Sequence, residues 1–144
     1  MTRRIDVFLP KLLPASVLSP NHGERKEGRV PIMIGRAKRD MREATYLGLL
    51  AEDAVRAIGS PFDHAHVALT LRWHKRTHGR AVYLPDDPGN ACYSLKAAID
   101  GIVDAGLLAD DSYRHIDLLT TRVERCDSLE GEGLFISVIE IEAA

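Results

Sequence analysis

Residues 90–111 read NACYSLKAAIDGIVDAGLLADD, and this stretch decides the fold that the sequence predicts. Apolar side chains recur in it at three- and four-residue steps, the spacing of one face of an amphipathic helix. The members of this face are Cys92, Leu95, Ile99 and Ile102. We therefore expect a helix over residues 91–105, with Asn90 as its N-cap and Gly106 as the residue that ends it.

Segments that alternate between apolar and polar residues predict the strands around this helix. They are residues 5–9, 65–73, 116–123 and 134–141, with residues 81–84 as a short candidate strand. Residues 116–123 and 134–141 flank a turn-forming stretch, so we expect these two strands to form a hairpin. A further run of apolar residues at helical spacing predicts a first helix over residues 36–58, which Gly59 and Pro61 end.

The predicted order of elements is β-α-β-(β)-α-β-β, which is typical of an α+β fold with a mixed β-sheet and two main helices packed on it. The 144 residues fit a single domain, residues 1–144. No apolar run reaches the roughly 20 residues that cross a bilayer, and no apolar stretch of a signal peptide follows Met1. Cys92 and Cys126 form neither a disulfide framework nor a zinc motif. We therefore expect a cytoplasmic protein that makes no membrane contact.

Positive charge is concentrated in two segments, although the formal net charge is -2. The first segment contains Arg36, Lys38, Arg39 and Arg42, and the second contains Arg72, Lys75, Arg76 and Arg80. Such clusters can bind phosphate groups even when the whole chain is slightly acidic. On charge alone, solvated surfaces explain both segments better.

Two pairs of carboxylates flank the predicted second helix, Asp86 and Asp87 before it and Asp110 and Asp111 after it. A helix of about 15 residues is about 22 Å long, so the pairs can meet only if the chain turns back after Gly106. Carboxylates held close together bind Mg²⁺, which activates water and neutralises charge on a phosphodiester. The alternative is that both pairs simply belong to well-formed turns, and the spacing alone favours that alternative.

Lys96 lies one helical turn before Asp100, so the two side chains share a helix face and can form an ion pair. Alternatively, Lys96 points toward the Asp87 end of the helix and binds a phosphate group. The residues taken alone favour the surface ion pair.

The same region is similar to the signature of the RusA-type Holliday junction resolvases. That signature runs D-x-D-N, a spacer, K-x-x-x-D, then A-G followed by D-D. Its parts here are Asp87 with Asn90, Lys96 with Asp100, Ala105 with Gly106, and Asp110 with Asp111. The detailed match covers about residues 87–112, and the order of elements matches over nearly the whole chain. The resemblance implies a small homodimeric α+β nuclease, often of phage or prophage origin. Such a protein resolves four-way DNA junctions in recombination and repair by symmetric nicking, with Mg²⁺ as cofactor.

The resemblance also implies a role for individual residues. Asp87 and Asp111 would be catalytic metal ligands, with Asp86 and Asp110 beside them as further ligands. Lys96 would act on the scissile phosphate. The candidate DNA contacts are Lys96, Asn90, Arg36, Lys38, Arg39, Arg72, Lys75 and Arg76. Contacts of this kind to the DNA backbone position the substrate without reading its sequence.

One position departs from the family signature, because Gly89 stands where the family has its second aspartate. Asp86 is close by and could replace the missing ligand, since a glycine loosens this turn. Otherwise the chain is a junction-binding homologue with weak or no cleavage. A third class, a histidine-based zinc protein, is disfavoured, because His74 and His78 lack both a helical setting and the glutamate of an H-E-x-x-H motif.

Overall fold

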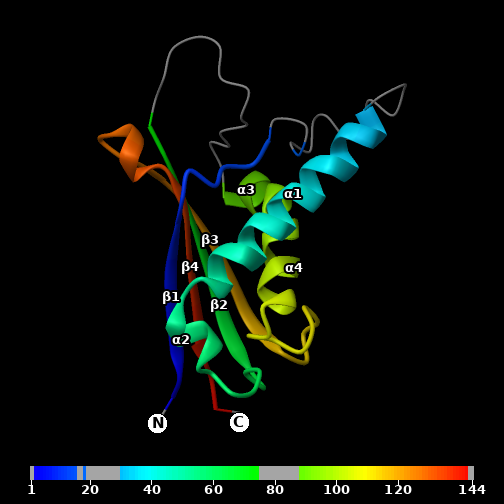
Figure 1. The fold of residues 1–144 in the computed structure, drawn as a ribbon, viewed down its shortest axis with the longest axis vertical. Helices are drawn as coiled ribbons and strands as arrows, with labels where there is room; N and C mark the ends of the chain where they lie inside the picture. Colours follow the sequence, from blue (N-terminus) through cyan, green and yellow to red (C-terminus); the bar gives the residue numbers. More distant parts are fainter. Residues whose placement is uncertain (1, 16–17, 19–29, 75–87, 143–144) are drawn as a thin grey trace.

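The computed structural model describes residues 2–15, 18, 30–74 and 88–142. Its elements in chain order are β1 (Arg4–Pro10), α1 (Val30–Leu50), α2 (Asp53–Arg56), β2 (Ala65–Trp73), α3 (Pro88–Ser94), α4 (Lys96–Asp104), β3 (Ile116–Arg125), the short 3₁₀ helix η3 (Leu129–Gly131) and β4 (Gly133–Glu140) (Figure 1). The predicted α+β class with a mixed sheet is confirmed. The candidate strand at residues 81–84 lies outside the described residues. Within the described ranges, no helix combines the length and apolar character needed to cross a membrane.

The sheet has the strand order β1-β4-β2-β3. β4 pairs antiparallel with β1 and β2, whereas β2 pairs in parallel with β3. The predicted hairpin of the last two strands is therefore wrong, because β2 lies between them. The connection from β3 to β4 passes over the end of β2, where the amide of Cys126 donates to the carbonyl of Trp73 at 2.9 Å. The amide of His74 donates to the carboxylate of Glu132 at 2.8 Å, so the backbone at the end of β2 is satisfied by the connection itself.

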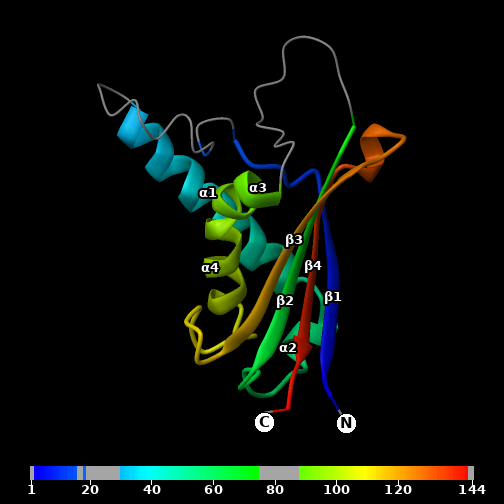
Figure 2. The same ribbon diagram turned by 180° about the vertical axis from the view of Figure 1, so that it is seen from behind.

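The helices α1, α3 and α4 lie on one side of the sheet in both views (Figures 1 and 2). β2 turns Val67, Leu69 and Leu71 toward this side, and all three side chains are fully buried. The alternation in residues 65–73 predicted this face, since successive side chains of a strand point to opposite sides. The core of the protein is thus the layer between the sheet and these helices.

Both predicted helices are interrupted. The first begins earlier than expected, at Val30, and ends at Leu50, before the separate short α2. The second consists of α3 and α4, which meet at Leu95. The side chain of Leu95 is fully buried, as the apolar spacing of the helix face predicts. Its backbone, with φ -98 and ψ 8, departs from helical geometry and separates the two helices.

The ends of the second helical region follow from proline and glycine. Asn90 lies inside α3, so its predicted role as N-cap is wrong. The helix begins at Pro88 instead. Proline suits the first turn because it lacks an N–H, and the N–H groups of that turn have no partner within the helix in any case. The predicted end at Gly106 is confirmed, since Gly106 has φ +84 directly after the C-cap residue Ala105.

A close crossing of α1 and α4 fixes the position of α4. A Cβ atom on Gly101 would lie 2.7 Å from the carbonyl oxygen of Arg42 and 2.7 Å from Cβ of Thr45, so only glycine permits this approach. The guanidinium of Arg42 also donates to both carboxylate oxygens of Asp104, at 2.6 Å and 2.8 Å. The first basic segment therefore contributes Arg42 to the packing of the fold.

Candidate functional site

The candidate site is centred on Lys96, the first residue of α4. Its Nζ lies 2.7 Å from Oδ1 of Asp100 and 2.5 Å from Oδ2 of Asp111. The predicted ion pair of Lys96 with Asp100 is confirmed, and Asp111 is a second partner that the sequence did not indicate. One ammonium group thus lies between two carboxylates, and we call these three residues the Lys96 triad.

Asp111 reaches Lys96 because the chain reverses direction at the end of α4. The amide of Gly106 donates to the carbonyl of Val103 at 2.9 Å, and the amide of Leu107 donates to that of Ile102 at 3.4 Å. This pair of bonds is a Schellman motif, which requires the left-handed conformation that glycine adopts easily. The carbonyl of Leu107 then accepts from the amide of Phe62 at 2.8 Å, which anchors the returning segment. The two carboxylate pairs could meet only if the chain turned back after Gly106. This reversal is present for Asp111.

The charges of the triad stabilise one another. The hydrogen bond from Lys96 holds the pKa of Asp111 below its ordinary value. Partial burial works against the ammonium of Lys96, but its hydrogen bonds to Asp100 and Asp111 outweigh that effect and raise its pKa. At neutral pH Lys96 is protonated and Asp111 is ionised, and the ionised carboxylate is the form that can bind a cation.

Asp110, the neighbour of Asp111, is directed into its own turn. Its Oδ1 accepts from the backbone amide of Ser112 at 2.8 Å, and its Oδ2 lies 3.8 Å from Nε2 of His115. Hydrogen bonds from the side chain and the backbone of Ser112 lower the pKa of Asp110. Asp110 thus shapes the turn that carries Asp111.

The expected ligands of a magnesium ion are described only in part. Asp86 and Asp87 lie outside the described residues, as do Lys75 and Arg76. The ranges that are described hold no group of three His, Cys, Asp or Glu side chains that could bind a metal ion. They do contain the carboxylates of Asp100, in α4, and Asp111, in the turn after α4, and both lie close to Nζ of Lys96. Carboxylate oxygens are the ligands that Mg²⁺ prefers, so the chemistry of these two donors fits such an ion.

The predicted basic contacts fall on different surfaces. Arg36, Lys38 and Arg39 are exposed on α1, the helix that crosses α4. Arg72 belongs to an outward position of β2, where it pairs with Glu124 at 3.2 Å. Its guanidinium also lies 5.7 Å and 6.0 Å from the ring centroids of Phe135 and Phe8. The helix-bearing side of the sheet carries the Lys96 triad, so the structure does not bring Arg72 together with it. Asn90 belongs to α3, the short helix that precedes α4, in which Lys96 is the first residue.

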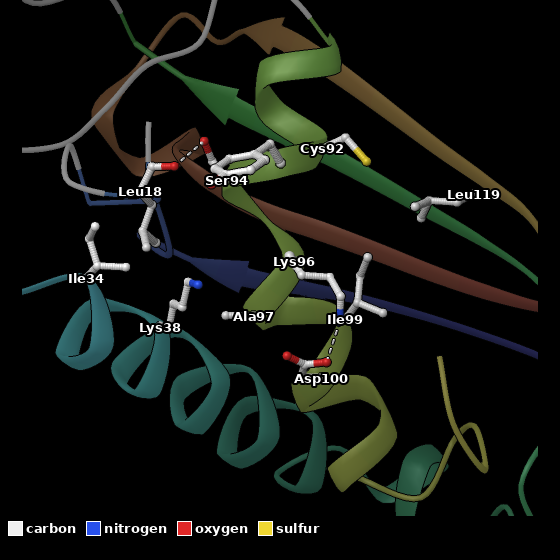
Figure 3. A pocket seen from close by; sticks show the side chains of 11 residues that line it. Leu18, Ile34, Lys38, Cys92, Ser94, Lys96, Ala97, Ile99, Asp100 and Leu119 are labelled. Carbon is white, nitrogen blue, oxygen red and sulfur yellow. Dashed lines mark hydrogen bonds and ion pairs between the residues drawn. The ribbon is translucent and has the colours of Figure 1, made fainter. Parts of the chain in front are cut away.

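A cavity of about 440 Å³ adjoins the Lys96 triad (Figure 3). Its lining residues come from α1, the α3–α4 region, β3 and the isolated position 18: Leu18, Ile34, Lys38, Cys92, Tyr93, Ser94, Lys96, Ala97, Ile99, Asp100 and Leu119. Sequence reasoning did not identify this cavity, because its walls are far apart in the chain. Cys92, a member of the apolar face of the predicted helix, is half-buried at this cavity.

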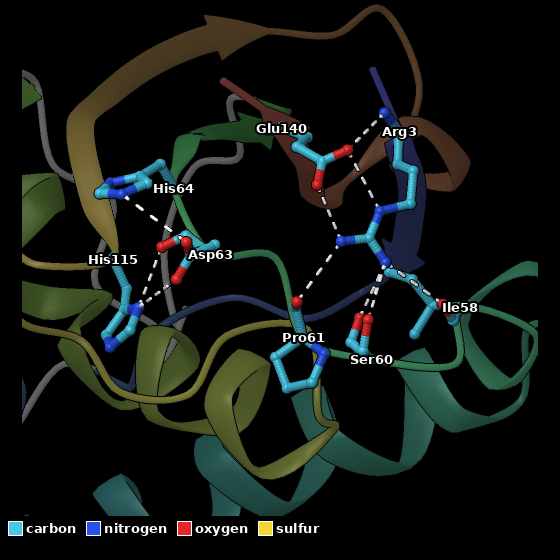
Figure 4. A network of polar contacts seen from close by, with 8 residues as sticks. All are labelled: Arg3, Ile58, Ser60, Pro61, Asp63, His64, His115 and Glu140. Carbon is cyan, nitrogen blue, oxygen red and sulfur yellow. Dashed lines mark hydrogen bonds and ion pairs between the residues drawn. The ribbon is translucent and has the colours of Figure 1, made fainter. Parts of the chain in front are cut away.

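A second polar network ties the ends of the described chain together (Figure 4). Arg3 donates to both carboxylate oxygens of Glu140, at 2.8 Å and 3.1 Å, and to the carbonyl of Ser60 at 2.9 Å. The hydrogen bond from Arg3 lowers the pKa of Glu140 to about 2. Nearby, Nδ1 of His115 lies 2.9 Å from the carbonyl oxygen of Asp63. These contacts fasten the loop before β2 to the ends of β1 and β4, which is a structural role.

Comparisons with models of protein families and with curated proteins found no match to this chain.

Proposed function

We propose that this protein is a Mg²⁺-dependent, structure-selective endonuclease of the RusA type, which resolves Holliday junctions and other branched DNA by symmetric nicking. The observation that carries the proposal is the contact of Lys96 with Asp111, 15 residues further along the chain. These residues stand at the lysine and second acidic positions of the family signature. The lysine and the last aspartate of a motif that is spread over the sequence are thus in contact.

Each residue of the triad has a role in the proposed reaction. Asp111 would hold the metal ion, and Asp87, with Asp86 near Gly89, would approach from the other end of the helical region. A bound Mg²⁺ lowers the pKa of a coordinated water and offsets charge that develops on the phosphate. If the carboxylates held the cation, Lys96 would be free to donate to a phosphate oxygen. An ordinary lysine is protonated at neutral pH, so Lys96 would be cationic for that contact.

The remaining parts of the proposal concern the assembly on DNA. A homodimer would present two such sites to opposed strands of a junction, since a two-fold protein matches a two-fold substrate. The exposed cations of α1, namely Arg36, Lys38 and Arg39, would bind backbone phosphates. The observed α+β arrangement with a mixed sheet is compatible with the RusA-like fold that the resemblance implies.

A second candidate function is junction binding with little cleavage. It is favoured by Gly89, which is exposed in the first turn of α3 and offers no side-chain ligand. The basic surface of α1 would then bind the junction, while the metal site would lack the donor needed for efficient hydrolysis.

An Asp111→Asn variant tests the enzyme against the binder. We expect wild-type protein to produce paired, symmetric nicks in a labelled four-way junction when Mg²⁺ is present. Asp111→Asn should lose the nicks and bind the junction with unchanged or higher affinity. Asp127→Asn is the matched control, because Asp127 is an exposed aspartate on the β3–β4 connection. Full cleavage by Asp111→Asn would remove Asp111 from the site, and shifted but intact DNA with wild-type protein would favour the binder.

A further inference from the structure

The cavity beside the Lys96 triad has walls from α1, the α3–α4 region, β3 and position 18 (Figure 3). Ile34 and Lys38 line it from α1, Ala97 from α4, and Leu119 from β3. Its volume of about 440 Å³ falls within the range of cavities that bind small organic groups. The junctions of α1, α4 and the sheet therefore leave room for a ligand at the edge of the proposed active site.

The walls of this cavity suit a flat, weakly polar group. Leu18, Ile34, Ala97, Ile99 and Leu119 give the cavity an aliphatic wall, and Tyr93, a residue that is 59% exposed, adds an aromatic ring. Ser94 does not offer a free hydroxyl, since its Oγ donates to the carbonyl of Asn90 at 2.9 Å. Nucleobases bind to such surfaces through stacking and apolar contact, which any base can make.

Two ammonium groups border the same cavity from different helices. Lys38 of α1 is exposed, and in the described part of the chain no ion pair of Lys38 is found. Lys96 of α4 lines the cavity while it contacts Asp100 and Asp111. Asp100 also lines the cavity, but its Oδ1 accepts from Lys96 at 2.7 Å, so Lys38 is the cation of this border that the described residues leave without an ion pair. An apolar and aromatic pocket beside that cation matches a nucleotide, which has a flat base and an anionic phosphate.

We propose that this cavity binds one unpaired nucleotide of branched DNA, with its base inside and its phosphate near Lys38 and Lys96. The proposal rests on the proposed function and names the part of the substrate that the site selects. Bases at a branch point are already partly unstacked, so moving one of them into a pocket costs less than in a continuous duplex. The nucleotide beside the scissile phosphate would thus be held next to Asp111.

A thermodynamic cycle between the DNA and the cavity tests this proposal. Binding to a four-way junction is measured without Mg²⁺, for an intact junction and for junctions with one abasic site at each branch-point position in turn. For wild-type protein we expect one abasic position to weaken binding about tenfold, the typical effect of losing one stacked base. Leu119→Trp fills the cavity and should remove this difference. Leu118→Trp, on the opposite side of β3, should retain it.

A second variant and a second ligand complete the test. Ile34→Trp fills the cavity from α1 and should also remove the effect of the abasic site. It keeps the test valid if Leu119→Trp fails to fold. Ile32→Trp, at an exposed position of α1, is its control. Wild-type binding that is equal for intact and abasic junctions overturns the inference but leaves the proposed function standing. Absence of any junction binding overturns both. A free deoxynucleoside monophosphate that saturates the wild-type cavity, with no abasic effect in DNA, would assign the cavity to free nucleotides instead.

Discussion

Nζ of Lys96 lies 2.5 Å from Oδ2 of Asp111, and this contact joins the first turn of α4 to the turn that follows the helix. The side chain of Lys96 is 55% exposed, so solvent screens the pair. An exposed ion pair contributes little to folding, whereas the proposed function gives Lys96 a role in the reaction. The two roles can be separated by experiment.

Substitution of Lys96 by methionine should separate them. We expect Lys96→Met to lose junction nicking while the free energy of unfolding falls by less than about 1 kcal/mol, because exposed ion pairs contribute little. Urea denaturation measures the stability, and nicking of a labelled junction measures the activity. Equal losses in both would instead make Lys96 a structural residue.

The pair of Arg3 and Glu140 predicts how stability depends on pH. The pKa of Glu140 is about 2 in the folded protein, below its ordinary value of 4.5. The folded state therefore binds fewer protons than the unfolded state between these values, and the stabilisation is present above pH 4.5 and is lost as the pH falls toward 2. We expect Glu140→Gln to lower the melting temperature at neutral pH and to reduce its decline across this acid range.

The control for that measurement is Glu130→Gln, at an exposed position of η3. It should melt like wild-type protein at every pH. If Glu140→Gln and wild-type protein showed parallel melting curves from pH 7 to pH 2, the ion pair with Arg3 would have no role in acid stability.

The close crossing at Gly101 predicts the effect of a single methyl group. Gly101→Ala would place a Cβ atom 2.7 Å from the backbone of Arg42, so α1 and α4 must move apart. We expect a loss of about 1–3 kcal/mol in the free energy of unfolding, the usual cost of overpacking. Gly35→Ala in α1 meets nothing within 4 Å and should stabilise the protein by up to about 1 kcal/mol. Equal stability of the two variants would contradict the close approach.

The sequence predicted those elements whose signals are local. The alternation over residues 65–73 gave the buried face of β2, and Gly106 marked the end of α4 because its left-handed conformation favours glycine. Leu95 shows the limit of this reasoning. Its apolar side chain fits the helix spacing, so nothing in the pattern signals that the backbone bends there.

Features that depend on tertiary contacts were beyond local patterns. Residues 116–123 and 134–141 are consistent with a hairpin, and only the sheet as a whole decides that β2 lies between them. Likewise, the spacing of Lys96 and Asp111 permitted a contact without requiring it, since the contact depends on Phe62 holding Leu107. The cavity needs α1, α4 and β3 in place before it exists.

The position of Gly89 leads to a gain-of-function prediction. Gly89 is exposed in the first turn of α3, where a carboxylate is compatible with the positive end of the helix dipole. If a metal ligand is missing there, Gly89→Asp should raise the rate of junction nicking, most strongly at low Mg²⁺ concentration, because the added donor tightens metal binding. Nicking rates across a Mg²⁺ titration measure the effect. Gly35→Asp adds the same charge to an open helical position of α1 and should not change the Mg²⁺ dependence. An unchanged titration for Gly89→Asp would mean that Gly89 does not limit the site and that Asp86 already supplies the ligand.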